Sequence, residues 1–258
     1  MSKKHLFIPD TQVREGVPTD HLEALGNYIV DKKPDVIVMA GDFADFPSVS
    51  VYGAPIEREG QRLYHDIGSA RAAMRRLLEP IETYNSKRQS NKKKLYRPRM
   101  VLTMGNHEYR LVRYVQNHPE LMGWFDTDDP VGYIDYGWEV IPYERIINID
   151  GIRYSHLFRN PQTLKKSVLG GTIDNKLNKL GWSFTMGHQQ HLQYGIQHLS
   201  DGGVRQGLVA GAFYQHNEGY LGEQGNDHWR GAVLKHEVHD GRYDPCFVSL
   251  NYLLDNWL

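Results

Sequence analysis

The sequence lacks the features that mark several protein classes. A single cysteine among 258 residues means that no disulfide can form within the chain, and it excludes thiolate-rich zinc or iron–sulfur sites. No apolar run approaches the roughly 20 residues of a membrane span. The stretch Leu6–Ile8 is too short for a secretory signal, which needs about 7–15 apolar residues. Neither sign of charge dominates, since the formal net charge is -1. We therefore expect a globular, cytoplasmic protein with no membrane partner.

The first two-thirds of the chain alternate short apolar runs with amphipathic segments. Buried strands are predicted at His5–Ile8, Val36–Ala40 and Met100–Met104. Apolar residues recur at intervals of three and four from Leu63 to Ile81, which is the pattern of an amphipathic helix. Strands that alternate with helices in this way predict a layered α/β fold.

The last third of the chain has many short strand signals separated by Gly, Asp and Asn turns. This pattern favours meander pairing of neighbouring strands. Because no repeat or low-complexity linker interrupts the chain, we predict a single domain over residues 1–258. The strands predicted in this part are Ile146–Ile149, Ile152–Ser155, Phe184–Met186, Ile196–Leu199, Val204–Ala210, Gly231–Val238 and Phe247–Leu253.

One stretch departs from the even charge balance. Residues 71–99 contain ten Lys or Arg and only two acidic residues, which gives the stretch a net charge of +8. It belongs to a basic helical and loop insertion at about 60–99. One interpretation is a solvated helix face followed by a disordered loop around Ser86–Lys94. The other is a patch near the active face that attracts polyanions such as nucleic acid.

Five polar clusters follow predicted strands and contain residue types that bind divalent metals. In α/β sheets ligands bind at the carboxyl ends of strands, so these clusters should converge in space. Asp, Asn and His side chains suit ions such as Mn²⁺, Fe²⁺ or Zn²⁺. A glycine precedes Asp42, Asn106 and His188, which permits tight turns close to the site. The clusters are Asp10 to Gln12, Gly41 to Asp45, Gly105 to Glu108, Ser155 to His156 and Gly187 to His191.

Together these clusters resemble the ordered motif set of the calcineurin-like metallophosphoesterases. That set reads D-x-H, G-D-x-x-D, G-N-H-[DE], H and G-H-x-H, and the matching positions here span residues 10–191. The chain looks like the short bacteriophage or bacterial members. The resemblance implies a four-layer α-β-β-α sandwich, with two mixed sheets flanked by helices and a two-metal centre at the strand ends.

The resemblance also implies a ligand set for the metals. By position, Asp42 bridges two divalent ions, while Asn106, His156 and His188 complete one metal site. Asp10 and Asp42 belong to the other. We expect Mn²⁺, with Fe, Zn, Mg or Ni as alternatives.

Three further side chains receive roles in catalysis or substrate binding. The resemblance places His107 beside the metals, where it stabilises a phosphoryl oxygen or protonates the leaving group. Asp45 orients His107 through a hydrogen bond to its ring. Arg110 is positioned either to contact a phosphate oxygen or to form a salt bridge on its helix.

Two departures from the motif set fall on the metal site that includes Asp10. Gln12 stands where the family usually has His, and it either binds metal through its oxygen or holds a water molecule. Gln190 occupies the second His position of the last motif, and His191 follows one residue later. We favour rescue of the site by His191; a single-metal or exchangeable-metal enzyme is the alternative.

These observations predict a phosphodiesterase in which a metal-bridging hydroxide attacks phosphorus, with nucleic acid or a nucleotide as substrate. Phosphoprotein phosphatases of this type place an Arg after the second motif, whereas this chain continues with Phe46 and Pro47. The alternatives are a phosphomonoesterase (a nucleotide or protein phosphatase) and a non-catalytic module that binds metal or nucleic acid. Residues 211–231, rich in Gly and aromatics, form either a substrate wall or ordinary packing.

Overall fold

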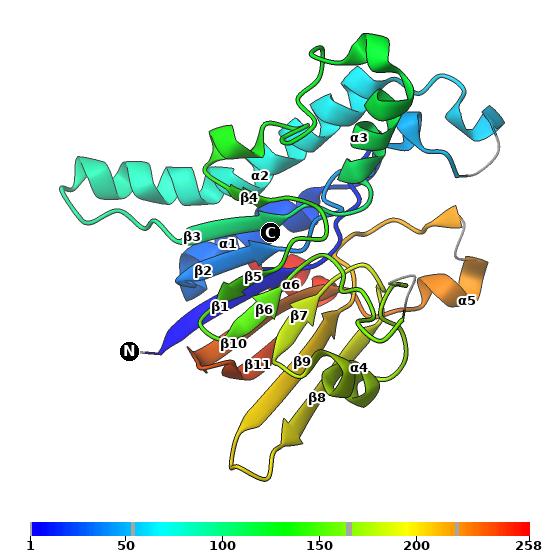
Figure 1. Ribbon diagram of the computed structural model, residues 1–258. Coiled ribbons are helices and arrows are strands. Elements are labelled where there is room, and N and C mark those ends of the chain that lie inside the picture. Colours follow the sequence, from blue (N-terminus) through cyan, green and yellow to red (C-terminus); the bar gives the residue numbers. More distant parts are fainter. Residues whose placement is uncertain (1, 53–54, 164–166, 220–221) are drawn as a thin grey trace.

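The computed structural model describes residues 2–52, 55–163, 167–219 and 222–258 and contains two mixed sheets (Figure 1). The six-stranded sheet has the order β11 (Arg242–Ser249), β10 (Gly231–His239), β1 (Lys3–Ile8), β2 (Val36–Met39), β3 (Arg99–Thr103) and β4 (Glu139–Ile141). The five-stranded sheet has the order β5 (Ile147–Ile149), β6 (Ile152–Tyr154), β7 (Phe184–Met186), β9 (Val204–Ala210) and β8 (Leu192–His198). Strands β1 to β4 run parallel, as do β6, β7 and β9.

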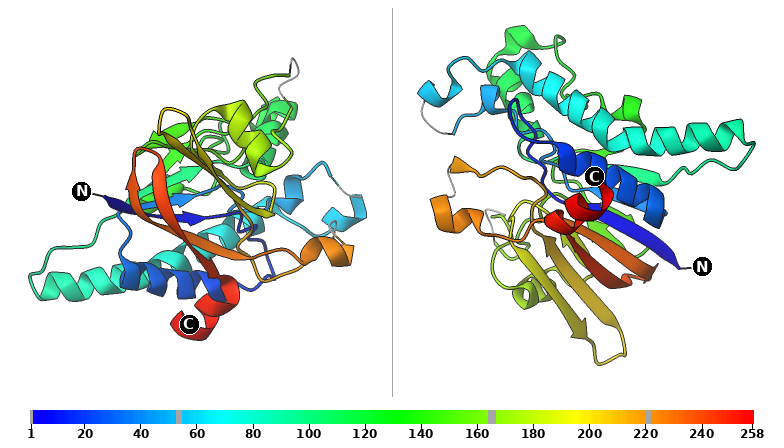
Figure 2. Two further views of the ribbon diagram at one scale, coloured as in Figure 1. Left: turned by 90° about the horizontal axis from the view of Figure 1, so that it is seen from below. Right: turned by 180° about the vertical axis from the view of Figure 1, so that it is seen from behind.

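Helices cover the outer face of each sheet. Seen from behind, α1 (Asp20–Lys32), α2 (Leu63–Ser90) and α6 (Leu250–Trp257) lie over the six-stranded sheet (Figure 2). Helix α4 (Ile173–Leu180) packs on the five-stranded sheet, where Leu177 and Leu180 join Phe184 in one apolar cluster. The predicted four-layer sandwich is therefore confirmed. The shorter helices α3 (Glu108–Asn117) and α5 (Gly222–Asn226) lie near the carboxyl ends of the strands.

The central strands are apolar on both faces because both faces are covered. In β1, Leu6 and Ile8 belong to the core beneath the helices, while Phe7 belongs to the core between the sheets. Strand β2 repeats this division with Met39 and Val38. Successive side chains of a strand point to opposite faces, so an unbroken apolar run suits a strand buried on both sides.

Helix α2 continues to Ser90, so the predicted disordered loop around Ser86–Lys94 is wrong for its first half. The apolar stripe stops at Ile81, but the end of the helix is tied down by polar contacts. The Asn85 side chain donates to and accepts from the backbone of Tyr96, at 2.8 Å in both bonds. The Tyr96 hydroxyl in turn donates to the carbonyl of Pro34 at 2.7 Å.

These contacts also place the lysine-rich end of α2. Pro34 precedes β2, whereas the second polar cluster follows the other end of that strand. Residues 87–94 therefore lie near the amino ends of the strands, opposite the carboxyl ends where the polar clusters lie (Figure 1). The expectation that the basic stretch borders the active face is therefore wrong for residues 87–94.

The predicted strand Phe247–Leu253 is also wrong in its second half. Strand β11 ends at Ser249, and the chain continues as helix α6. The Ser249 side chain accepts a hydrogen bond from the backbone N–H of Tyr252, which caps the helix at its first turn. Within the described ranges, the helices are all too short or too polar to cross a bilayer.

Candidate active site

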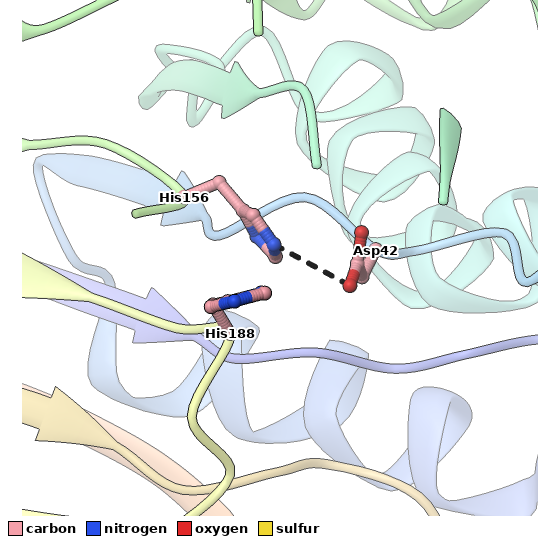
Figure 3. A group of neighbouring side chains, drawn as sticks. All are labelled: Asp42, His156 and His188. Carbon is pink, nitrogen blue, oxygen red and sulfur yellow. Dashed lines mark ion pairs between the residues drawn. The ribbon is translucent and has the colours of Figure 1, made fainter. Parts of the chain in front are cut away.

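Four of the predicted ligands meet between the carboxyl ends of the two sheets. Asp42 and Asn106 follow β2 and β3 of one sheet, while His156 and His188 follow β6 and β7 of the other. Ligand atoms of Asp42, His156 and His188 all lie within 4.8 Å of one another (Figure 3). The Oδ1 atom of Asn106 lies 2.8 Å from His156 Nε2 and 2.8 Å from His188 Nδ1.

The hydrogen bonding of His156 shows that this group fits a cation. Its Nδ1 lies 2.9 Å from the carbonyl oxygen of Ala40, which only accepts, so Nδ1 carries the proton. In the neutral ring Nε2 is then a lone pair, and it faces Asn106 Oδ1 at 2.8 Å and Asp42 Oδ2 at 3.4 Å. Three acceptor atoms that point at one another are satisfied by a divalent metal ion. A backbone partner on the second nitrogen is the usual arrangement for a histidine that binds metal.

Glu108, the last residue of its cluster, holds the backbone around Asp42. It is fully buried, and its Oε2 accepts from the N–H groups of Asp42 at 2.8 Å and Gly105 at 2.9 Å. Its Oε1 accepts from Phe43 at 2.8 Å and Ala44 at 3.1 Å. These bonds hold Asp42 in the left-handed region, with φ at 48°, which non-glycine residues seldom adopt.

Two glycines allow the loops to touch. A Cβ on Gly105 would lie 2.0 Å from Asp42 Oδ1, and one on Gly187 would lie 2.2 Å from Asp10 Oδ1. Both distances are far below van der Waals contact, so these positions accept only glycine. The expected role of the glycines beside Asn106 and His188 is confirmed.

Asp10 holds the backbone of His188 through hydrogen bonds. Both oxygens of its carboxylate lie 3.0 Å from the backbone nitrogen of His188, which donates to them. Burial and the nearby charge of Asp42 raise the pKa of Asp10 well above its ordinary value. Burial, together with His156, lowers the pKa of His188 to about 4, so its ring is neutral near pH 7.

The predicted second metal position is less complete. Gln12 is buried and lines the cavity, and neither Oε1 nor Nε2 has a hydrogen-bond partner in the described part of the chain. Gln190 accepts from the Tyr214 hydroxyl at 2.9 Å, and His191 is exposed at the cavity wall. Neither Asp10 nor His191 belongs to the ligand group found among the described residues. Metal binding by Asp10, Gln12 and His191 stays a prediction.

His107 lies beside the ligand group and is held by Asp45. Its Nδ1 is 2.7 Å from Asp45 Oδ1, and its Nε2 is 3.6 Å from Asp42 Oδ2. Burial alone would lower the pKa of His107, but Asp42 and Asp45 outweigh it and raise that pKa. Burial also opposes ionisation of Asp45, yet contacts with His107 and Arg110 keep the pKa of Asp45 well below its usual range.

Arg110 forms a salt bridge, but with Asp45 in the loop after β2 and not with a residue of its own helix, and its contact with a phosphate oxygen stays a prediction. Its Nη1 donates to Asp45 Oδ1 at 2.9 Å, and its Nη2 lies 2.9 Å from His107 Nε2. A second arginine, Arg14, donates to Asp45 Oδ2 at 3.0 Å and to Glu218 Oε1 at 2.6 Å. No motif in the sequence indicates the roles of Arg14 and Glu218; the one signal for Arg14 is its place two residues after Gln12.

A cavity of about 480 Å³ opens over these groups. Gly225 and His228 form part of its wall, so the segment 211–231 does border the site. Its other lining residues are Gln12, Asp42, Tyr52, Asn106, His107, Arg110, His188, Gln189, Gln190 and His191.

The chain is similar to several known proteins. The sequence profile of the calcineurin-like phosphoesterase family matches residues 4–217. The Gene 54 protein of Mycobacterium phage L5 is 31% identical over 150 residues, which cover 55% of this chain and 52% of that protein, about half its length. The solved structure of TT1561 of Thermus thermophilus is 9% identical, with a TM-score of 0.34 over 96% of this chain and 99% of that one. Since the profile covers most of the chain, the protein belongs to the calcineurin-like phosphoesterase family.

Proposed function

We propose that the protein is a metal-dependent phosphodiesterase that acts on nucleic acid or nucleotide substrates in the cytoplasm. The observation that carries the proposal is the convergence of acceptor atoms from Asp42, Asn106, His156 and His188 beside the hydrogen-bonded pair of His107 and Asp45. A cation site next to a positioned proton donor is what cleavage of a phosphate ester requires.

The residues present fit divalent metal ions, and Mn²⁺ is the ion we expect. Asp42, Asn106, His156 and His188 would hold one ion, and Asp10 with Gln12 would form part of a second position. When bound, such ions polarise the phosphoryl oxygens and lower the pKa of a water molecule.

The remaining chemistry belongs to His107, Asp45 and Arg110. Asp45 holds Nδ1 of His107 and favours the protonated ring, so Nε2 is the atom that gives a proton to the leaving oxygen. Arg110 Nη2 faces the same Nε2. That contact leaves no room for an oxygen atom, so Arg110 must turn towards a phosphate oxygen of the substrate before Nε2 can carry and donate its proton.

Charge favours a diester over a monoester. Arg110 is the one arginine in the cavity wall so far as the described residues show, and Asp45 already pairs with it. Apart from the metal ions, the wall therefore offers little positive charge for the additional negative charge of a monoester, which carries about −1.5 to −2 at pH 7, and a singly charged diester needs none. Phe46 is fully buried and supplies no phosphate contact at the position where phosphoprotein phosphatases have Arg.

The test compares two chromogenic substrates with the Mn²⁺-loaded protein. We expect bis-p-nitrophenyl phosphate to be cleaved with a higher kcat/KM than p-nitrophenyl phosphate. Asp42→Asn and His107→Ala should each reduce turnover by at least about 100-fold, the scale of general acid catalysis. Asp255→Asn, on the exposed face of α6, is the matched control and should leave turnover unchanged. Wild-type protein that is as inert as both variants with every divalent metal would support the binding-module alternative instead.

A further inference from the structure

A second cavity of about 340 Å³ adjoins the catalytic one. It lies between α3 and the short 3₁₀ helices η1 (Pro47–Val49) and η2 (Pro55–Arg58). The two cavities share Arg110 as a lining residue. They also meet at consecutive residues, because Val51 lines the second cavity and Tyr52 the first. The two cavities are therefore neighbours on either side of Arg110, and a ligand that passes this side chain would reach from one to the other.

The second cavity is strongly basic, and we call it the arginine cavity. Arg110 and Arg113 are three residues apart on α3, which puts them on the same side of the helix, and Arg58 reaches the cavity from η2. In the described part of the chain, no carboxylate lines this cavity, and the Arg113 side chain has neither a hydrogen bond nor an ion pair. Among the described residues, the Arg58 side chain donates one hydrogen bond, to the carbonyl of Tyr52 at 3.2 Å.

The arginines are the lining groups that suit an anion. The ring of His118 adds no donor in its neutral form, because Nδ1 lies 2.9 Å from the carbonyl of Tyr114 and carries the proton, which leaves a lone pair on Nε2. Arg110 is already paired with Asp45, but among the described residues Arg58 and Arg113 have no carboxylate partner, so these two guanidinium groups repel each other unless an anion lies between them. Arginine is the side chain best shaped to bind a phosphate, because its planar fork donates two parallel hydrogen bonds.

We propose that the arginine cavity binds a second phosphate of the substrate, one nucleotide away from the phosphate that is cleaved. This inference rests on the proposed phosphodiesterase function and narrows its substrate to a nucleic-acid strand or a nucleotide with a further phosphate. The cavity size fits such a group, since 340 Å³ lies within the range of ligand pockets, about 300–1,000 Å³. The arginine cavity thus supplies the polyanion attraction that the lysine-rich end of α2 is too distant to provide.

The kinetic test uses two substrates that differ by one phosphate: thymidine 5′-(p-nitrophenyl phosphate) with and without a 3′-phosphate. For the Mn²⁺-loaded wild type, kcat/KM should be higher for the substrate with the 3′-phosphate. Arg113→Gln and Arg58→Gln should each lower the ratio of the two kcat/KM values by about tenfold, the scale of one hydrogen bond to a charged group. Lys93→Gln, which removes an equal charge just beyond the far end of α2, should leave the ratio unchanged. If neither Arg113→Gln nor Arg58→Gln alters the ratio, the proposal that the cavity binds the 3′-phosphate is overturned.

A binding test with an oligonucleotide probes phosphates on both the 3′ and the 5′ side and does not depend on turnover. The affinity of a fluorescent oligothymidylate is measured by anisotropy against salt concentration, in a His107→Ala background. Adding Arg113→Gln should weaken binding about tenfold and reduce the slope of log affinity against log salt by about 0.7, the value for one contact to a single strand. An equal loss with Lys93→Gln would show general attraction of charge and would overturn the arginine cavity. If the wild type cleaves neither chromogenic substrate, the proposed function fails, while the binding comparison still decides whether this cavity holds phosphate.

Discussion

Glu108 is the residue whose replacement tests the architecture of the site most directly. In Glu108→Gln an NH₂ group replaces one carboxylate oxygen. If it replaces Oε2, the N–H groups of Asp42 and Gly105 lose their acceptor; if it replaces Oε1, those of Phe43 and Ala44 do. A hydrogen bond to a charged group contributes about 1.5–3 kcal/mol. Losing two should therefore lower the free energy of unfolding by about 3–6 kcal/mol.

Urea unfolding measures this loss, and calorimetric titration with Mn²⁺ measures its effect on the ligands. Because Glu108 holds the backbone of Asp42, the variant should also bind Mn²⁺ about 10–100-fold more weakly, as is usual for residues that orient metal ligands. Glu120→Gln, at an exposed position in a short 3₁₀ helix, is the control and should change stability by less than about 0.5 kcal/mol. A loss below about 1 kcal/mol in Glu108→Gln would show that these four hydrogen bonds do not hold the site together.

Three further predictions concern pH, packing and positioning. Burial lowers the pKa of His21 to about 4, so the unfolded chain binds more protons between that pH and about 6.5. The free energy of unfolding should then fall by up to about 3 kcal/mol as pH drops through this window, and a His21→Asn variant with an unchanged pH slope in urea unfolding would contradict it. Gly187→Ala should displace Asp10 and weaken Mn²⁺ binding, measured by calorimetry, at least about tenfold. Gly68 is exposed in α2 and has nothing within 4 Å, so Gly68→Ala should instead raise the free energy of unfolding by about 0.5–1 kcal/mol. A lower free energy of unfolding in both variants would contradict the difference expected between the two sites. Arg14→Gln should lower kcat on the diester about tenfold with little change in KM, Arg14→Lys should restore part of it, and an unaltered kcat would remove Arg14 as a positioning residue.

The layered fold could be predicted because the central strands are apolar on both faces, as in β1 with Leu6, Phe7 and Ile8. Hydrophobic periodicity did not predict the structure correctly where polar contacts, rather than apolar packing, determine it. The end of α2 has no apolar stripe beyond Ile81, and the contact between Asn85 and Tyr96 that holds it joins residues eleven apart. The run at 247–253 suits either a strand or a helix, and a cap at Ser249 decided between them.

The residues that meet at the site could be predicted from their places after strands, as Asp42, Asn106, His156 and His188 show. Their supports could not, because each depends on contacts across the fold. Glu108 acts on a loop 64 to 66 residues earlier. The same is true of the arginine cavity, which forms only where the helix that carries Arg110 and Arg113 meets η2.

The placement of the ligands on two separate sheets has a mechanical consequence. Asp42 and Asn106 follow strands of one sheet, and His156 and His188 follow strands of the other, so the ion proposed to bind all four would link the two sheets. If one sheet moved along the other, the four ligand atoms would separate, and the free energy of metal binding would oppose that movement. By linkage, saturation at about 100 times the dissociation constant would strengthen the assembled sandwich by about 2.7 kcal/mol. Chelation should therefore loosen the junction of the sheets as well as stop the chemistry.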